Sequence, residues 1–377
     1  MSFNNEIFDP ILKSMAPCVW SDGSLKHSID IYAYDNFHCD DDAEQPEGIF
    51  AATEELRTHL NSTPPYSPKE NVVFEALCRI VHGSNLIEGA GTSPVCTTGL
   101  WRSSLGRQTP EHLSQKHIVY RWLKLEQHRR ERTDDDATIQ KIYREVVQHL
   151  CALMFLLDEI VLQDKPFSEE LIPKAHKILT YKVDSAADSY NVYGGVYRTT
   201  DVCAGLTTFT APEHVPREMR ALIAALSSEI LAAEQVGHID PYLLAAKYCH
   251  KFINIHPFVD GNGRMCQLIL NILLFKYAGD FCVLGENEQA KDEYLSIAVR
   301  GSQSDQTWKE SDEEEAASMK PPWGELALLI LRQSRKGMQE VLQHETFLRN
   351  PPKCFHRSVQ AGHEVAEGSS SKTDEQT

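Results

Sequence analysis

Apolar side chains recur at helical spacing, about three to four residues apart, through most of this 377-residue chain. Between residues 70 and 88, for example, Val73, Leu77 and Val81 share one face of a predicted amphipathic helix. A stretch at 137–163 is apolar on most faces and predicts a central helix. Further helices are expected after Ser168 and at 216–236, 241–255, 265–277, 289–300 and 324–348. The predicted fold class is therefore mainly α.

One region departs from this helical pattern. Between Tyr190 and Pro212, β-branched and aromatic side chains gather around Gly194, Gly195 and Gly205. This composition is typical of short strands joined by turns. The segment predicts a small β-hairpin, and no other part of the chain shows a comparable hairpin pattern.

Changes in composition suggest where the helical domain begins and ends. Residues 1–65 mix short apolar patches with an acidic stretch and predict an N-terminal arm. Residues 66–348 carry the helical pattern and predict one domain, in which 100–135 is polar and 301–322 is expected to form a surface loop. Residues 349–377 have the composition of a disordered tail.

Charge and cysteine usage narrow the classes of function. The net charge is −17, from 37 basic and 54 acidic residues, which argues against a nucleic-acid partner. The ten cysteines form no C-x-x-C pair, so reduced thiols in a cytoplasmic or nuclear protein are expected. The N-terminus has no uninterrupted apolar core, and no run approaches 18 apolar residues. We therefore expect neither a signal peptide nor a membrane span.

The stretch with the clearest chemistry is HPFVDGNGR, from His256 to Arg264, just ahead of the helix predicted at 265–277. A Gly-Asn-Gly turn that opens a helix leaves backbone N–H groups unpaired and favours a phosphate. His256 titrates near neutral pH and suits a general base. The carboxylate of Asp260 suits Mg²⁺ held together with substrate phosphates. Arg264 and Gln267 lie three apart, on one face of the helix.

Together these groups indicate transfer of a phosphate-containing group from a nucleotide to a hydroxyl. A lone Gly-x-Gly or a lone histidine is usually structural, and only their joint occurrence in nine residues points to a site. The stretch is neither a dinucleotide fingerprint nor a P-loop, because the third glycine and the Gly-Lys-Ser/Thr end are missing. A zinc site is disfavoured, because the nearby Cys and His spacings match no usual cluster.

His256 to Arg264 resembles the HPFx(D/E)GNGR signature of the Fic (Fido) domain family. Residues 193–198 resemble the start of that family's β-hairpin flap, and residues 84–89 resemble its (S/T)xxxE(G/N) inhibitory helix, here at about 70–89. Tyr294 sits where the family often has a tyrosine against the adenine. The resemblance covers roughly residues 70 to 340 and implies a Fic-type helical bundle with a small β-hairpin flap.

Fic proteins mostly transfer AMP from ATP to a Ser, Thr or Tyr hydroxyl of a target protein, and some members remove it. The resemblance implies that His256 deprotonates the hydroxyl, that Asp260 holds Mg²⁺ and that Arg264 neutralises the leaving pyrophosphate. The core motif spans 256–267.

The resemblance also assigns roles to the neighbouring residues. It implies phosphate contacts from the amides around Gly261, Asn262 and Gly263, and ATP-facing contacts from Gln267. Glu88 would be the inhibitory residue that projects into the γ-phosphate site.

The flap, about 193–212, would align the target segment as an added strand. The flap residues expected to take part are Arg198, Thr207 and Thr208.

The chain departs from the family at Gln267, where the signature normally has a second arginine. Losing one charge-assisted hydrogen bond costs on the order of 1.5–3 kcal/mol, or about 10- to 150-fold in binding or rate. Three consequences stay open: a slow transferase, an enzyme that removes AMP with Glu88 orienting water, or tolerance of Gln267 through a hydrogen bond to Glu88. A scaffold that has lost catalysis is the alternative of another class. The oligomeric state, a homodimer included, also stays open.

Overall fold

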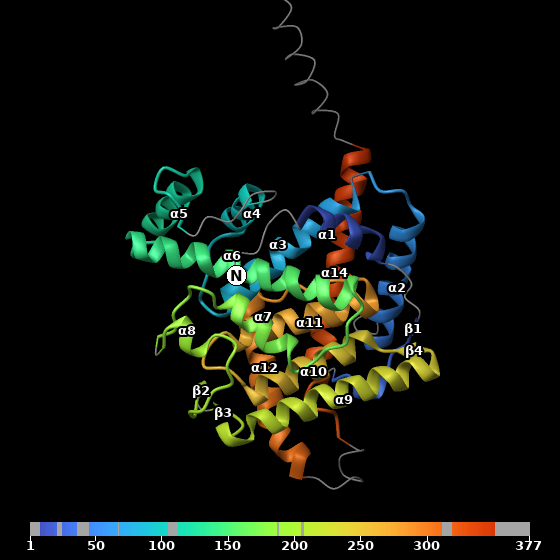
Figure 1. Ribbon diagram of the computed structural model, residues 1–377. Helices are drawn as coiled ribbons and strands as arrows, with labels where there is room; N and C mark the ends of the chain where they lie inside the picture. The colour runs from blue at the N-terminus through green and yellow to red at the C-terminus, as the bar shows by residue number, and fades with distance from the viewer. Residues whose placement is uncertain are drawn as a thin grey trace, which may run out of the picture.

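The computed structural model describes residues 8–20, 25–35, 45–66, 68–104, 112–186, 188–204, 207–310 and 319–350, and helices dominate them (Figure 1). In chain order the helices are α1 (Phe8–Met15), α2 (Pro46–Ser62), α3 (Lys69–Ile87), α4 (Pro94–Ser104), α5 (Ile118–Arg129), α6 (Asp136–Leu156), α7 (Leu171–Leu179), α8 (Tyr190–Tyr193), α9 (Val215–Val236), α10 (Pro241–Ile255), α11 (Asn262–Ala278), α12 (Glu288–Glu310) and α14 (Gly324–Arg349). A π-helical turn, η5 (Leu157–Leu162), continues α6, and short 3-10 turns lie at η2 (Ala16–Cys18), η3 (Ile31–Ala33) and η6 (Pro212–His214). The mainly α fold class is confirmed.

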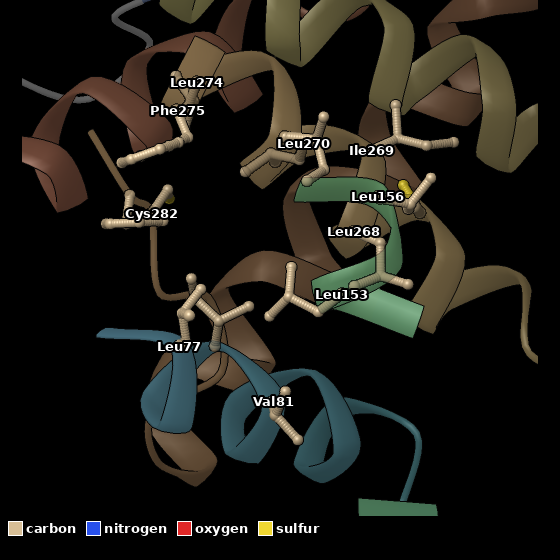
Figure 2. Packing of buried hydrophobic residues seen from close by; sticks show 14 of the residues in the cluster. Leu77, Val81, Leu153, Leu156, Leu268, Ile269, Leu270, Leu274, Phe275 and Cys282 are labelled. Carbon is tan, nitrogen blue, oxygen red and sulfur yellow. The ribbon is translucent and has the colours of Figure 1, made fainter. Parts of the chain in front are cut away.

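Helix α11 lies at the centre of the fold. Its side chains are buried on almost every face, from Met265 to Phe275. Helix α10 packs along it, and α3 and α6 also contact it. Figure 2 shows Leu77 of α3 and Leu153 of α6 among the buried side chains gathered around Leu268 of α11. Because each fully buried leucine stabilises the fold by about 1.5–3 kcal/mol, this packing makes α11 a rigid support for the loop at its N-terminus.

The structure corrects the extent of the expected hairpin. Strand β2 (Cys203–Ala204) pairs antiparallel with β3 (Thr207–Thr208), so a small hairpin is present inside the predicted segment. Residue 193, however, ends helix α8 instead of starting a strand. Gly194 caps this single helical turn, whose tyrosine and valine side chains imitate a strand pattern.

A second pair of strands was not predicted from the sequence. β1 (Lys26–His27) lies parallel to β4 (His238–Ile239). Two-residue strands are too short to show an alternation of apolar and polar positions. Their partners also lie more than 200 residues apart in sequence.

Two polar regions are more helical than expected. Helix α12 continues to Glu310, so the loop expected at 301–322 is wrong over its first ten residues. The rest of that loop up to 318 lies outside the described residues. Helices α4 and α5 were not predicted. In α5 some apolar side chains are buried, such as Leu123, while others are exposed, such as Trp122 and Leu125, so its apolar positions do not mark one clear face. Most of the tail expected at 349–377 also lies outside the described residues.

The N-terminal arm contributes two helices to the fold. Helix α1 packs against α3, and α2 packs against α14 (Figure 1). None of the described helices is long and apolar enough to span a bilayer.

Candidate active site

The motif loop connects α10 to α11 through a sharp turn. Helix α10 ends at Ile255 and is capped by His256, whose backbone is left-handed at φ 52° and whose N–H donates to the Phe252 carbonyl at 3.0 Å. This conformation is uncommon for a residue with a side chain and is often found at functional sites. Pro257 follows and has no N–H with which to continue the helix. The turn therefore brings His256 to the entrance of the loop instead of leaving it on the side of α10.

Asn262 braces the loop from inside. Its side chain accepts a hydrogen bond from the Phe258 N–H at 2.9 Å and donates one to the Phe258 carbonyl at 2.8 Å. Gly261, with φ 80°, precedes α11 as its N-cap, and the first N–H groups of α11 have no partner within the helix. The N–H of Gly261 donates to Asp260 Oδ1 at 2.6 Å. Of the three amides expected to bind phosphate, that of Gly261 is thus already engaged by the neighbouring carboxylate.

His256 has the geometry of a neutral base. Its Nδ1–H donates to the Ile253 carbonyl at 3.2 Å, and its ring stacks on Phe209 with the centroids 3.9 Å apart. Burial lowers the pKa of His256 to about 4, and the nearby Arg198 charge adds to this effect. The imidazole is therefore neutral near pH 7, with its lone pair on Nε2.

Arg264 is a buried cation that lacks most of its hydrogen-bond partners. It is 3% exposed, and its Nη2 lies 3.4 Å from Asp260 Oδ1. Neither Nε nor Nη1 has a partner among the described residues. Buried donors are normally satisfied, so two unpaired N–H groups beside a helix N-terminus fit an anion that would bind there.

Glu88 reaches this anion site from another helix. It caps the C-terminus of α3, and its Oε1 lies only 1.7 Å from where a Cβ on Gly263 would stand. The residue as a whole is solvent-exposed, but its carboxylate lies against the first turn of α11. Desolvation of this carboxylate raises the pKa of Glu88; the positive charge of Arg264 opposes the shift and the negative charge of Asp260 adds to it. An anion at Gly263 and the Glu88 carboxylate would therefore compete for the same space.

Gln267 and Tyr294 lie deeper, below the loop. Gln267 is 3% exposed, and its Nε2 has no hydrogen-bond partner in the described part of the chain, Glu88 included. Tyr294 is 4% exposed, and burial raises its pKa. The tyrosine ring is thus packed in the core and not presented at a surface.

Arg198 ties the flap to the motif loop. It is 3% exposed, and its guanidinium donates to the carbonyls of His256 at 2.7 Å, Thr200 at 3.0 Å and Ile255 at 3.3 Å, and also to that of Thr210. Its backbone N–H donates to the Pro257 carbonyl at 2.9 Å. Thr207 and Thr208 form β3 of the hairpin itself.

His176 of α7 was missed by sequence reasoning. It is fully buried, hydrogen-bonds to the Asp260 carbonyl at 2.8 Å and stacks on the Phe258 ring with the centroids 3.7 Å apart. A lone histidine in a short amphipathic helix, 84 residues before Asp260, gives no signal in the sequence. Only folding brings it against the loop.

The motif loop itself offers a divalent cation one carboxylate, that of Asp260. No group of three or more His, Cys, Asp or Glu side chains in the described ranges could hold a metal ion by itself. Asp260, with a side chain 35% exposed, borders a cavity of about 380 Å³ that Lys141 and Glu145 of α6 also line. Mg²⁺ is commonly held by one or two carboxylates together with substrate phosphates, so this donor set fits Mg²⁺ bound with a nucleotide.

Fold and site together define a helical domain that can bind an anion at a helix N-terminus, next to a neutral histidine. Residues 166–274 match the family model of the Fic/DOC family. The matched segment contains the motif loop, the hairpin and His176.

Relatives in other organisms resemble this domain over a limited length. A Fido domain-containing protein of Dictyostelium discoideum is 39% identical over 92 residues, which are 24% of this chain and 62% of that protein. The protein adenylyltransferase fic-1 of Caenorhabditis briggsae is 36% identical over 108 residues, 29% of this chain and 20% of its own length. The chain thus spans under two thirds of the former relative and about a fifth of the latter.

Solved structures share the fold over most of the chain. A Fic domain containing signaling protein from Bacteroides thetaiotaomicron superposes with a TM-score of 0.56 at 18% identity, covering 78% of this chain and 97% of that one. Fic-1 from C. elegans superposes with a TM-score of 0.57 at 19% identity, covering 80% and 72%. At these identities the likeness concerns the fold alone.

Proposed function

We propose that this protein transfers AMP from ATP to a hydroxyl group of a target protein. The observation that carries the proposal is the pairing of neutral His256 with Arg264, a buried arginine whose Nε and Nη1 lack partners among the described residues. His256 begins the loop that leads to α11, and Arg264 lies in the first turn of α11, where a phosphate is favoured. The proposal is supported by relatives of the same domain that are named protein adenylyltransferases.

In the proposed reaction the target hydroxyl oxygen attacks the α-phosphorus of ATP. The bond from that phosphorus to the oxygen bridging to the β-phosphate breaks, and pyrophosphate leaves. His256 Nε2 takes the hydroxyl proton, because Nδ1 keeps its hydrogen for the Ile253 carbonyl. The guanidinium of Arg264 and the first amides of α11 neutralise the charge of the phosphates.

Asp260 would hold Mg²⁺ together with the phosphates, and the cation would neutralise charge on the leaving group. The hairpin strand that contains Thr207 and Thr208 would align the target segment by pairing with its backbone. Arg198 supports that strand from below, since it joins the Thr210 carbonyl to the His256 carbonyl. Tyr294 would stand behind Gln267 and support the nucleotide pocket from the core.

Glu88 would restrain this reaction. Its carboxylate lies against Gly263, at the end of α11 where the triphosphate would bind, and a second anion there is repelled. Gln267 offers an amide N–H with no partner among the described residues, but no charge, for the outer phosphates. We therefore expect the triphosphate to bind about 10- to 150-fold more weakly than it would at a site with a second arginine.

The reverse reaction is the second candidate. In removal of AMP from a modified protein no γ-phosphate has to bind, so the neutral Gln267 carries no penalty. Glu88 is open to solvent and next to the anion site, and it could orient an attacking water there.

The location that we propose is the cytoplasm or the nucleus. The described cysteines include Cys78, Cys151, Cys249 and Cys282, all buried and all free. Free thiols in such number are more typical of a reducing compartment than of secretion.

The deciding experiment compares four proteins: wild type, Glu88→Gly, His256→Ala and Gln267→Arg. Each is incubated with Mg²⁺ and ATP labelled at the α-phosphate, and label on protein is measured. A transferase restrained by Glu88 gains label in Glu88→Gly and loses it when His256→Ala is added.

Three other results would redirect the proposal. Labelling only after Gln267→Arg would show that the natural site is impaired as a transferase. Release of AMP from a pre-modified protein, abolished by Glu88→Gly, would favour the reverse reaction. Nucleotide binding with neither labelling nor release in any of the four proteins would favour a scaffold.

A further inference from the structure

His176 connects the motif loop to the base of the flap. Its side chain is fully buried. One ring nitrogen, Nε2, lies 2.8 Å from the Asp260 carbonyl oxygen, and the other, Nδ1, lies 2.9 Å from the Gly195 backbone nitrogen. The ring is almost parallel to that of Phe258, at 3°.

These contacts fix both the tautomer and the rotation of the ring. A backbone N–H can only donate, so Nδ1 must accept from Gly195. Nε2 therefore carries the hydrogen and donates it to the Asp260 carbonyl. Rotating the ring by half a turn would lose both bonds, although the ring would stay in the same plane against Phe258.

The surrounding backbone leaves room for this arrangement only because two residues are glycines. Gly195 has φ 77°, and a Cβ there would stand 2.6 Å from the Pro173 carbonyl oxygen. A Cβ on Gly261, which has φ 80°, would stand 3.3 Å from His176 Nε2. The flap base and the motif loop can approach the imidazole closely because both positions lack a side chain.

Each part of the motif loop has its own brace. Arg198 holds the carbonyls of His256 and Pro257, and Asn262 holds both backbone groups of Phe258. The carbonyl of Asp260 is held by His176. Since the loop turns between Asp260 and Gly261, the direction of this peptide decides where the Asp260 carboxylate points.

We infer that His176 is a positioning residue, which fixes the Asp260 peptide and thereby aims the Asp260 carboxylate for a divalent cation bound with the nucleotide. The inference rests on the proposed function for the identity of that ligand. The hydrogen bond from Nε2 is the one that affects cation binding, whereas the bond at Nδ1 only anchors the base of the flap.

Three variants separate the two hydrogen bonds of the ring. His176→Gln retains a donor at the ε position, opposite the Asp260 carbonyl. His176→Asn retains an acceptor at the δ position, opposite Gly195. His176→Phe retains the stack on Phe258 and loses both bonds.

His27→Phe is the matched control for a buried histidine. The His27 side chain is 5% exposed, its Nε2 lies 2.9 Å from the Tyr277 carbonyl oxygen, and its Nδ1 lies 3.1 Å from Glu54. It is remote from the motif loop, in β1. The His27→Phe variant should be less stable than the parent, with no change at the motif loop.

The experiment measures binding of a non-reacting ATP analogue by calorimetry at increasing Mg²⁺, in full-length protein carrying Glu88→Gly to relieve the restraint. We expect His176→Phe to raise the Mg²⁺ concentration for half-maximal binding roughly 10-fold or more, as for other partners of metal ligands. Binding without Mg²⁺ should be unchanged. His176→Gln should stay within about twofold of the parent, and His176→Asn should behave like His176→Phe.

Amide hydrogen exchange at Gly261 gives a second readout that needs no nucleotide. This N–H donates to Asp260 Oδ1, so it reports the direction of the carboxylate. We expect faster exchange at Gly261 in His176→Phe and His176→Asn, and parental exchange in His176→Gln and His27→Phe.

The inference is overturned if all three His176 variants lower stability while the Mg²⁺ requirement and the Gly261 exchange stay parental, since His176 is then a core residue only. Rescue by Asn and not by Gln would also overturn it, because the effect would then come from Gly195. If His176→Phe does not fold, the contrast between Gln and Asn still decides. Failure of every protein to bind the analogue would refute the proposed function, while the exchange at Gly261 would still test the positioning.

Discussion

Arg198 should contribute more to stability than any exposed arginine of this chain, because its guanidinium donates hydrogen bonds to backbone carbonyls inside the protein. The resemblance placed Arg198 among the residues that align a target, whereas in the structure it is 3% exposed and donates to four carbonyls. Burial lowers the pKa of Arg198. The perturbation that tests its role is Arg198→Met, which keeps the aliphatic volume and removes every donor.

The magnitude follows from the hydrogen bonds that would be lost. Two of them, to the carbonyls of His256 at 2.7 Å and Thr200 at 3.0 Å, have good lengths. Each hydrogen bond from a charged group contributes about 1.5–3 kcal/mol, so their loss would cost roughly 3–6 kcal/mol. Removing the charge also removes its desolvation penalty, which moves the expected loss to the lower end, about 3 kcal/mol.

The assay is urea denaturation of the 377-residue protein, from which the free energy of unfolding is obtained. Arg217→Met is the control, because Arg217 has a side chain 66% exposed and, within the described ranges, pairs only with its neighbour Glu218. That control should change stability by no more than about 0.5 kcal/mol. Arg198→Lys should recover only part of the loss, since an ammonium cannot reproduce the planar fork of donors.

A loss in Arg198→Met no larger than that in Arg217→Met would refute the reasoning. If Arg198→Met lowered the affinity for the target while the free energy of unfolding stayed parental, the flap role implied by the resemblance would be correct. The hydrogen bonds from Arg198 to backbone carbonyls would then not matter for stability.

Two further predictions concern pH and the glycines of the turn. Burial lowers the pKa of His149 to about 3, below the value of about 6.5 for a free imidazole, so its contribution to stability is complete above pH 6.5 and lost as the pH falls toward 3. His149→Asn, which can still donate to Asn85, should reduce the slope of unfolding free energy against pH by up to about 1.4 kcal/mol per unit between pH 6 and 4; an unchanged slope would contradict this. Gly261→Ala should cost about 1–2 kcal/mol in urea denaturation because φ is 80°. Gly263→Ala should cost under about 0.5 kcal/mol, because only the flexible Glu88 carboxylate has to move, and equal losses for the two would argue against this account.

The sequence predicted the central helices well, because their apolar periodicity is strong and long. The helix at 241–255 matches α10, and that at 324–348 matches α14 within a residue. It missed α5 and the end of α12, because the apolar residues of α5 do not form one buried face and the last ten residues of α12 are mostly polar. Strands of two residues, such as β1, carry no periodicity that a pattern could reveal.

At the site, the sequence could name the residues of the motif loop, since they are contiguous and chemically distinctive. It could not say that the Asn262 side chain braces Phe258, or that the Gly261 amide is engaged by Asp260. Both contacts depend on the backbone conformation of the loop, which is left-handed at His256 and Gly261. The order of residue types along the chain does not predict this conformation.

By itself, the sequence determined the kind of fold and the chemical groups available, because periodicity and residue type are local properties. The helical pattern, the histidine, the carboxylate and the Gly-Asn-Gly turn are all found in short stretches of it. The tertiary structure alone decided which distant groups act on that turn. Glu88 reaches it from α3, Arg198 braces it from the flap and His176 braces it from α7. Such contacts arise from packing around α11, which joins residues far apart in the chain and leaves no trace in the spacing of residues along it.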